Sequence, residues 1–258
     1  MSLTNQVAIV TGGGNGIGRA IAQRLARDGA DVVVAGRRQA TLEESAAGVR
    51  ALGKKALAIV TDVSREDDVS AMAKKTLEAF GRIDILVNNA GIMGPTAPVV
   101  SVKRADWDEV LAINLTGAYQ CAKAALPDMI ARRSGKIINI SSVAGRMAYA
   151  LRSPYAVSKW GMIGLTLTLA AEAGASNIQV NVVCPGPVAG ERIRRVIEHR
   201  AAELGRPVAE VERIYVEDTA LKRMASEEDV AALVAFLASS EADNITGEAI
   251  DVSAGHSL

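Results

Sequence analysis

Residues 7–18 read VAIVTGGGNGIG, and this stretch predicts the fold of the chain. The run from Val7 to Thr11 is apolar or β-branched throughout rather than alternating, which is typical of a parallel strand covered on both faces. A glycine-rich turn follows it. Beyond the turn, apolar residues recur at three- and four-residue steps, which predicts an amphipathic helix. These residues are Ile17, Ile21, Ala22, Leu25 and Ala26.

The same alternation continues along the chain. Six more short apolar runs follow, separated by segments of helical periodicity: 31–35, 56–61, 83–88, 136–141, 178–184 and 249–252. Strands that alternate with helices predict a parallel sheet, and right-handed crossovers place helices on both of its faces. We therefore expect one α/β domain over residues 1–258, a doubly wound, Rossmann-type parallel sheet of about seven strands.

One region interrupts this alternation. Some forty residues separate the sixth strand from the last helix, which we expect at about 227–238. A long insertion after the carboxyl end of a strand lies where ligands bind in this architecture, so we expect a small helical lid at about 187–225. A solvated helical pair that only covers the sheet edge is the alternative. One helical face of the insertion is apolar: Ile193, Val196, Ile197, Ala201 and Leu204.

Composition excludes several classes of protein. Lys and Arg number 29 and so do Asp and Glu, so the chain lacks the positive charge of a phosphate-neutralising nucleic-acid binder. It has no apolar run long enough to span a membrane and no targeting leader, so we expect a cytoplasmic protein without membrane contacts. Cys121 and Cys184 read as reduced core thiols, and neither His199 nor His256 has metal-ligand spacing. We expect no metal centre.

The turn after the first strand has the spacing T-G-x-x-x-G-x-G, with glycines at Gly12, Gly16 and Gly18. This differs from the G-x-G-x-x-G pattern of many dinucleotide-binding proteins. Glycines without Cβ atoms let backbone N–H groups and a helix N-terminus approach a pyrophosphate. A merely tight strand–helix turn is the alternative explanation for the same glycines.

Four further motifs follow in order. Asn88-Asn89-Ala90-Gly91 ends the fourth strand, and Asn114 lies in the sequence INLTG. Ser142 precedes Tyr155 by thirteen residues, and Tyr155-x-x-x-Lys159 opens a helix. Pro185-Gly186 follows the sixth strand. In this order the motifs resemble those of the short-chain dehydrogenase/reductase family, and the resemblance extends over nearly the whole chain.

The Tyr155–Lys159 pair also has a physical reading of its own. Residues four apart on a helix lie on one face, one turn apart. A free tyrosine has a pKa of about 10 and is a poor acid or base at neutral pH. A nearby ammonium favours the phenolate and lowers that pKa toward the working range.

The resemblance implies hydride transfer between a nicotinamide cofactor and a carbonyl or secondary alcohol. Tyr155 would then exchange a proton with the substrate oxygen, and Ser142 would hydrogen-bond the same oxygen. Lys159 would hold the nicotinamide ribose and lower the pKa of Tyr155. Asn114 would kink its helix and position a water that links Lys159 to solvent.

The resemblance also implies a set of cofactor-binding residues. Asp62 would contact the adenine, Asn89 to Gly91 would line the adenine ribose, and Pro185 to Val188 would lie along the nicotinamide. The full expected set is Gly12, Asn15, Gly16, Ile17, Gly18, Arg37, Arg38, Asp62, Val63, Asn89, Ala90, Gly91, Tyr155, Lys159, Pro185, Gly186 and Val188.

Two departures from the family pattern bear on the cofactor. The family commonly has Thr or Ser, which binds the carboxamide, where this chain has Gly190. NAD-preferring members commonly end the second strand with Asp, whereas this chain has Gly36 followed by Arg37 and Arg38. A guanidinium suits a phosphate, so NADP(H) is favoured and NAD(H) remains possible. A basic residue that many NADP-preferring members carry is Asn15 here, and a solvated loop without a cofactor role is the alternative for the two arginines.

The substrate is less constrained than the chemistry. We expect a small alcohol or carbonyl compound, with 3-oxoacyl thioester reductase and hydroxy acid or polyol dehydrogenase both open. A non-catalytic, cofactor-sensing regulator on the same fold is the other alternative. Five arginines near the expected substrate mouth could meet an anion, although interleaved glutamates also suit a solvated, self-paired face. They are Arg146, Arg152, Arg192, Arg194 and Arg195.

The helix after Tyr155 and the segment 117–129 are apolar almost all round, so each needs cover on more than one side. By resemblance, the matching helices pair across a two-fold axis, which implies a homodimer or homotetramer. Burial of these helices within one chain is the alternative.

Overall fold

The computed structural model describes residues 2–256, and this part of the chain forms one seven-stranded parallel sheet in the order β3-β2-β1-β4-β5-β6-β7. The strands are β1 (Val7–Thr11), β2 (Asp31–Gly36), β3 (Ala56–Val60), β4 (Ile85–Asn88), β5 (Gly135–Ile140), β6 (Ile178–Pro185) and β7 (Ala249–Val252). The chain starts at β1, builds outward to β3, and then returns to β4 on the other side of β1. The doubly wound α/β prediction is therefore confirmed, and the strand order reverses between β1 and β4, where such folds bind ligands.

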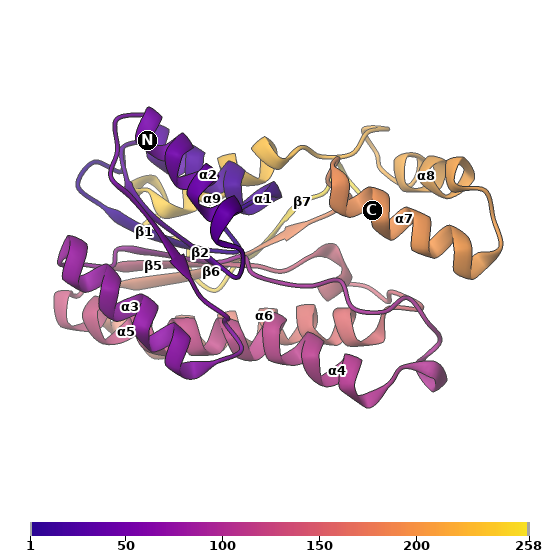
Figure 1. Ribbon diagram of the computed structural model, residues 1–258, viewed down its shortest axis with the longest axis horizontal. Helices are drawn as coiled ribbons and strands as arrows, with labels where there is room; N and C mark the ends of the chain where they lie inside the picture. The colour runs from indigo at the N-terminus through magenta and orange to yellow at the C-terminus, as the bar shows by residue number, and fades with distance from the viewer. Residues whose placement is uncertain (1, 257–258) are drawn as a thin grey trace.

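Helices cover both faces of this sheet (Figure 1). Alternate residues of β1 belong to different cores: Ala8 and Val10 pack with α1, α2 and α9, whereas Ile9 packs with α3, α5 and α6. This explains why the strand sequences are apolar without alternation. The helices are α1 (Gly16–Arg27), α2 (Gln39–Ala51), α3 (Glu66–Phe80), α4 (Arg104–Leu111), α5 (Gly117–Arg132), α6 (Ser153–Ala173), α7 (Glu191–Leu204), α8 (Val208–Glu217) and α9 (Glu227–Ala238). Among the residues described, no helix is both long and apolar enough to cross a membrane.

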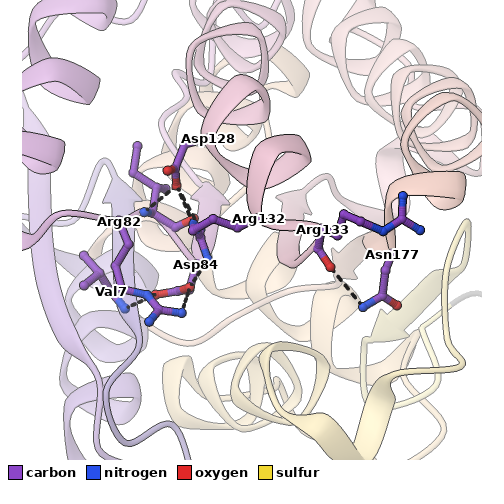
Figure 2. A network of polar contacts seen from close by, with 8 residues as sticks. Val7, Arg82, Asp84, Asp128, Arg132, Arg133 and Asn177 are labelled. Atoms are coloured by element: carbon purple, nitrogen blue, oxygen red, sulfur yellow. Dashed lines mark hydrogen bonds and ion pairs between the residues drawn. The ribbon is translucent and has the colours of Figure 1, made fainter.

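A charged network joins the amino ends of the strands (Figure 2). We call Arg82, Asp84, Asp128 and Arg132 the amino-edge network. Asp84 accepts hydrogen bonds from the Val7 N–H at 2.9 Å, from Arg82 at 2.7 Å and from Arg132 at 2.8 Å. Asp128 binds the other side of Arg132 at 2.8 Å. The fourth strand was predicted from residue 83, but β4 begins at Ile85, because Asp84 lies ahead of it in this network.

The 187–225 segment contains two helices, α7 and α8, which project from the same end of the sheet in Figure 1. Its two ends are pinned together, since Ala189 and Ala225 share a backbone hydrogen bond of 2.8 Å and Ala225 donates to Pro187 at 2.9 Å. Most of the predicted apolar face of α7 packs against α8: Val196, Ile197 and Ala201 are buried and Ile193 is partly buried. Leu204 is 44% exposed, because it ends α7 just before the left-handed Gly205 and lies beyond the packed face.

Candidate active site

The glycine-rich turn between β1 and α1 has the backbone that its sequence requires. Gly12 and Gly16 have φ values of +64° and +55°, the left-handed region that glycine adopts without strain. A Cβ atom on Gly18 would lie 2.2 Å from the Gly12 carbonyl oxygen. Asn15 caps α1 without a side-chain hydrogen bond, and the first turn carries no acidic residue. The N–H groups at this helix end are therefore not capped by a side chain, which suits a phosphate.

Asn89, which follows the neighbouring strand β4, stabilises the glycine-rich turn through hydrogen bonds. Its amide donates to the carbonyls of Thr11 at 2.9 Å and Gly12 at 3.2 Å. The Thr11 hydroxyl in turn accepts from the N–H groups of Asn89 and Ala90. The amide of Asn89 thus holds the protein's own backbone in place at the point where β1 and β4 diverge.

A cavity of about 220 Å³ runs from the glycine turn to the ends of β2 and β3. Arg37 and Arg38 are exposed at its side, and the Arg37 charge lies close enough to Asp62 to help lower the pKa of that carboxyl. The main cause of that lowered pKa is the hydrogen bond from Ser64, at 2.7 Å. Eight of the predicted cofactor residues line the cavity: Gly12, Asn15, Arg37, Arg38, Asp62, Val63, Ala90 and Gly91.

Asn114 lies in a π-helical turn, Ala112–Thr116, that joins α4 to α5. The fully buried side-chain amide of Asn114 points at the loop after β4. Its oxygen accepts from the Ile92 N–H at 2.8 Å, and its nitrogen donates to the Ile92 carbonyl at 3.0 Å. It also donates to the Ser158 hydroxyl at 3.1 Å, and that hydroxyl donates to the Tyr155 carbonyl. Single-turn π segments of this kind are frequent at functional sites.

Tyr155 and Lys159 lie on one face of α6, as their spacing predicted. The Lys159 ammonium is 5.7 Å from the centre of the Tyr155 ring and donates to the Ile140 carbonyl at 2.7 Å. Burial alone raises the pKa of Tyr155, but the charges of Lys159, Arg192 and Arg152 and a hydrogen bond with Ser142 outweigh it and hold the pKa below its ordinary value. Burial lowers the pKa of Lys159, and Tyr155 acts against that shift. The predicted Asn114, Ser142, Tyr155 and Lys159 therefore converge at the carboxyl ends of β4 and β5.

Comparisons with known proteins agree with this geometry. The sequence profile of the family described as short chain dehydrogenase matches residues 6–201. This chain belongs to the short-chain dehydrogenase family.

Individual relatives match along nearly their whole length. A short chain dehydrogenase/reductase of Aspergillus oryzae, astE, is 41% identical, and the alignment covers 100% of this chain and 97% of that protein. A 3-oxoacyl-(acyl-carrier-protein) reductase of Staphylococcus epidermidis is 37% identical, with 97% and 98% covered. The crystal structure of an NAD⁺-bound xylitol dehydrogenase superimposes with a TM-score of 0.97 at 32% identity and covers 99% of this chain and 100% of that one.

The segment after β6 departs from the short-chain dehydrogenase pattern at Gly190. Its φ is +149°, and a Cβ atom there would lie 3.2 Å from the Glu227 carboxylate. A threonine or serine would therefore meet Glu227, whose pKa is raised by burial and by Glu228. Pro185 is the last residue of β6 and Gly186 follows it, packed so closely on Ser253 that a Cβ would lie 2.7 Å from that side chain. Val188 forms an isolated bridge with Ala225.

The five arginines near the substrate mouth separate into two groups. Arg146 binds Asp251 and the Ala249 carbonyl, and Arg195 pairs with Glu191 on its own helix. Arg194 is exposed on α7. Arg152 and Arg192 instead act on Tyr155, since both charges lower its pKa.

Two contacts in this short-chain dehydrogenase had no signal in its sequence. The hydroxyls of Tyr149 and Tyr215 lie 2.8 Å apart and join the loop before α6 to α8. Ser158 relays Asn114 to the backbone of Tyr155. The Tyr149–Tyr215 and Asn114–Ser158 contacts link residues 66 and 44 positions apart, so neither follows a local spacing rule.

Proposed function

We propose that this protein is an NADP(H)-preferring oxidoreductase that interconverts a secondary alcohol and a ketone, or a similar carbonyl. The observation that carries the proposal is the convergence of Tyr155, Lys159, Ser142 and Asn114 beside a cavity lined by the glycine turn. The family uses NAD(H) or NADP(H), and the cradle of Gly12, Gly16 and Gly18 fits a pyrophosphate.

Each of the four residues has a role that follows from its surroundings. Tyr155 exchanges the proton with the substrate oxygen, because the charges around it bring its pKa toward the working range. Ser142, which hydrogen-bonds Tyr155, donates to the same oxygen and stabilises its developing charge. Lys159 favours the phenolate, and Asn114 holds the loop after β4 against α6. Bound NADP(H) would supply or accept the hydride.

The alternatives are weaker on this geometry. A cofactor-sensing regulator has no need of a tyrosine with a lowered pKa beside a buried lysine. The 187–225 segment contacts the site through Arg192, which donates to the Gly91 carbonyl at 3.3 Å, and this supports its role as a substrate lid. A spectrophotometric screen of ketones, acyl thioesters, polyols and hydroxy acids with NADPH and NADH tests the proposal. Turnover of no member of these classes with either cofactor would reject it.

The preference for NADP(H) rests on Gly36, Arg37 and Arg38, since no carboxylate occupies the end of β2 to repel a phosphate. Arg37→Ala should raise KM for NADPH about 10- to 100-fold, the loss of a charge-assisted hydrogen bond, and change KM for NADH little. Arg38→Ala should have a smaller effect. Arg65→Ala is the matched control, because Arg65 is close to Asp62 but does not line the cavity.

The converse change should favour NAD(H). A Cβ on Gly36 would touch only Leu42, at 3.4 Å, and the Gly12 Cα, at 4.0 Å, so Gly36→Asp fits the structure. Its carboxylate would repel a 2′-phosphate and bind ribose hydroxyls. Wild-type turnover that is faster with NADH than with NADPH at equal concentration would overturn the preference and leave the catalytic roles standing.

We also propose that the chain assembles as a homodimer or homotetramer through α5 and α6. Both helices expose large apolar side chains in the single chain: Tyr119, Ile130, Val157, Trp160 and Leu167 are 44–52% exposed. Sedimentation of the wild type and of Leu167→Glu tests this. A monomeric wild type would reject it.

A further inference from the structure

Arg152 is a buried cation without a counter-ion. It precedes α6, is 3% exposed, and pairs with no carboxylate among residues 2–256. Its two Nη atoms donate to the Thr96 hydroxyl at 3.1 Å and to the Met93 carbonyl at 2.7 Å. Its buried Nε–H has no acceptor. The guanidinium has five N–H donors, so several remain for a ligand.

An unpaired charge in this position is costly for the fold. Burial lowers the pKa of Arg152, and the nearby charge of Arg192 lowers it further, yet an arginine side chain stays protonated in proteins. A buried ion that lacks a partner destabilises the folded state unless something completes its surroundings. An uncompensated group beside a tyrosine with a lowered pKa is a candidate for ligand binding.

The surroundings of Arg152 place it in the substrate region. Its Cζ lies 5.3 Å from the centre of the Tyr155 ring. The side chains whose charges act on it are Tyr149, Tyr155 and Tyr215, which raise its pKa, and Arg192, which lowers it. None of these is a carboxylate. Tyr215 and Met93 belong to the apolar cluster that α7 and α8 form. The guanidinium therefore lies between the proton-exchanging tyrosine and an apolar wall.

We propose that Arg152 binds the carboxylate of the substrate, so that the natural substrate is a short hydroxy acid or the corresponding oxo acid. This proposal rests on the proposed function. Arginine's planar fork matches a carboxylate and can bind it through two parallel hydrogen bonds. Because Arg152 lies against Tyr155, the carboxylate and the reacting carbon must be close together in a small molecule. The carboxylate itself is unchanged in the reaction, and Arg152 only positions the substrate.

A purely structural role makes a different prediction. Arg152 holds the segment after β4 through Met93 and Thr96, next to the Ala97–Leu151 backbone hydrogen bond. If Arg152 only stabilised this segment, its loss would weaken the binding of charged and neutral ligands equally. The test must therefore compare ligands that differ in charge and share their shape.

The first experiment measures binding by calorimetry to the full chain saturated with NADP⁺, with propionate and the isosteric, neutral propionamide as probes. Propionate should bind at least about tenfold more tightly than propionamide, the contribution of one charge-assisted hydrogen bond. Arg152→Gln should abolish the difference. Arg194→Gln, which removes the same charge from the exposed face of α7, should retain it. Equal binding of the two probes, binding of neither, or a preference that survives Arg152→Gln would overturn the proposal.

A second variant distinguishes loss of the carboxylate contact from loss of the fold. Arg152→Lys keeps the charge and should keep a weakened preference for propionate, with thermal unfolding showing that the variant is folded. In turnover, Arg152→Gln should raise KM for a hydroxy acid and leave KM for its methyl ester nearly unchanged. An equal rise for acid and ester indicates a purely structural role and would also reject the proposal.

The binding experiment needs no turnover, so the two proposals fail separately. A protein that selects propionate through Arg152 but reduces no carbonyl compound contradicts only the proposed function. A protein that oxidises neutral alcohols without discriminating propionate from propionamide contradicts only the role of Arg152.

Discussion

Basic side chains gather at both edges of the sheet, but their partners differ. At the amino edge, Arg132 lies between two carboxylates, Asp84 and Asp128, each 2.8 Å away (Figure 2). At the carboxyl edge, Arg152 and Lys159 are more deeply buried and donate only to carbonyl and hydroxyl oxygens. The first set of charges is neutralised within the chain and the second is not.

This difference separates stability from function. A complete network of paired and hydrogen-bonded charges fastens the start of β1 to residues 83–84 ahead of β4 and needs nothing from outside. Positive charges without partners are costly in an apo protein, and natural sequences retain such costs mainly at functional sites. Variants at the two edges should therefore separate into those that lose activity and those that lose stability.

The largest effect is expected at the carboxyl edge from Tyr155→Phe. The ring still packs, so the fold and cofactor binding should be nearly unchanged, but the proton can no longer be exchanged. We expect kcat to fall roughly 10²- to 10⁴-fold. Tyr149→Phe is the matched control, because it removes a neighbouring hydroxyl whose partner is Tyr215 and should change kcat by only a few-fold. Retention of more than about a tenth of wild-type kcat by Tyr155→Phe would show that the assignment is wrong.

At the amino edge, Asp84→Ala should reverse this pattern. It leaves Arg132 without one of its two carboxylates and the Val7 N–H without its acceptor. We expect a loss of about 3 kcal/mol in the free energy of unfolding, with kcat per folded molecule unchanged. Urea denaturation measures it through the midpoint at constant slope. Asp251→Ala, which breaks the exposed pair with Arg146, should cost less than about 1 kcal/mol. Similar midpoints for the two variants would contradict the comparison.

The sequence predicted the fold well because its signals are local. Val7 to Thr11 is apolar on both faces because β1 lies between two cores, and Gly12, Gly16 and Gly18 are required by backbone geometry. The spacing of Tyr155 and Lys159 is likewise a property of one helix. Each of these inferences needs only neighbouring residues, and the structure contains all of them.

Whether each arginine pairs with a carboxylate could not be predicted in the same way. Arg132 has Asp128 four residues earlier on its own helix, but its second carboxylate, Asp84, is 48 residues away and has no local signal. The glutamates interleaved with Arg195 already indicated a self-paired face, and the structure pairs Arg195 with Glu191 on the same helix. The pairing of Arg146 with Asp251, 105 residues away, had no such local signal. Pairs within one helix follow the four-residue spacing, as Arg195–Glu191 does. Pairs between elements, such as Arg132–Asp84, depend on which strands become neighbours, and a single sequence does not encode that locally.

The smallest expected effect is a shift in the pH profile of kcat. The test removes one positive charge at each edge of the sheet and compares the two profiles. Arg192 is a solvent-exposed residue on the side of α7 that faces the site, and its charge lowers the pKa of Tyr155. Arg192→Gln should therefore raise that pKa without endangering the fold. Oxidation of an alcohol needs the phenolate, and its rate rises with pH as Tyr155 loses its proton. The rise in kcat should therefore move to higher pH in Arg192→Gln. Reduction needs the protonated tyrosine, so its decline with pH should move upward as well.

Arg82→Gln is the matched variant at the amino edge, where Asp84 keeps its bond to Arg132. Its pH profile should coincide with that of the wild type, because the charge it removes is already neutralised and lies at the far edge of the sheet. Salt gives an independent check, since screening of the exposed Arg192 charge should move the wild-type profile toward that of Arg192→Gln. The same salt should leave the profile of Arg192→Gln less affected. Equal shifts in the two variants would mean that Tyr155 responds to the net charge of the chain rather than to the unpaired charges around it.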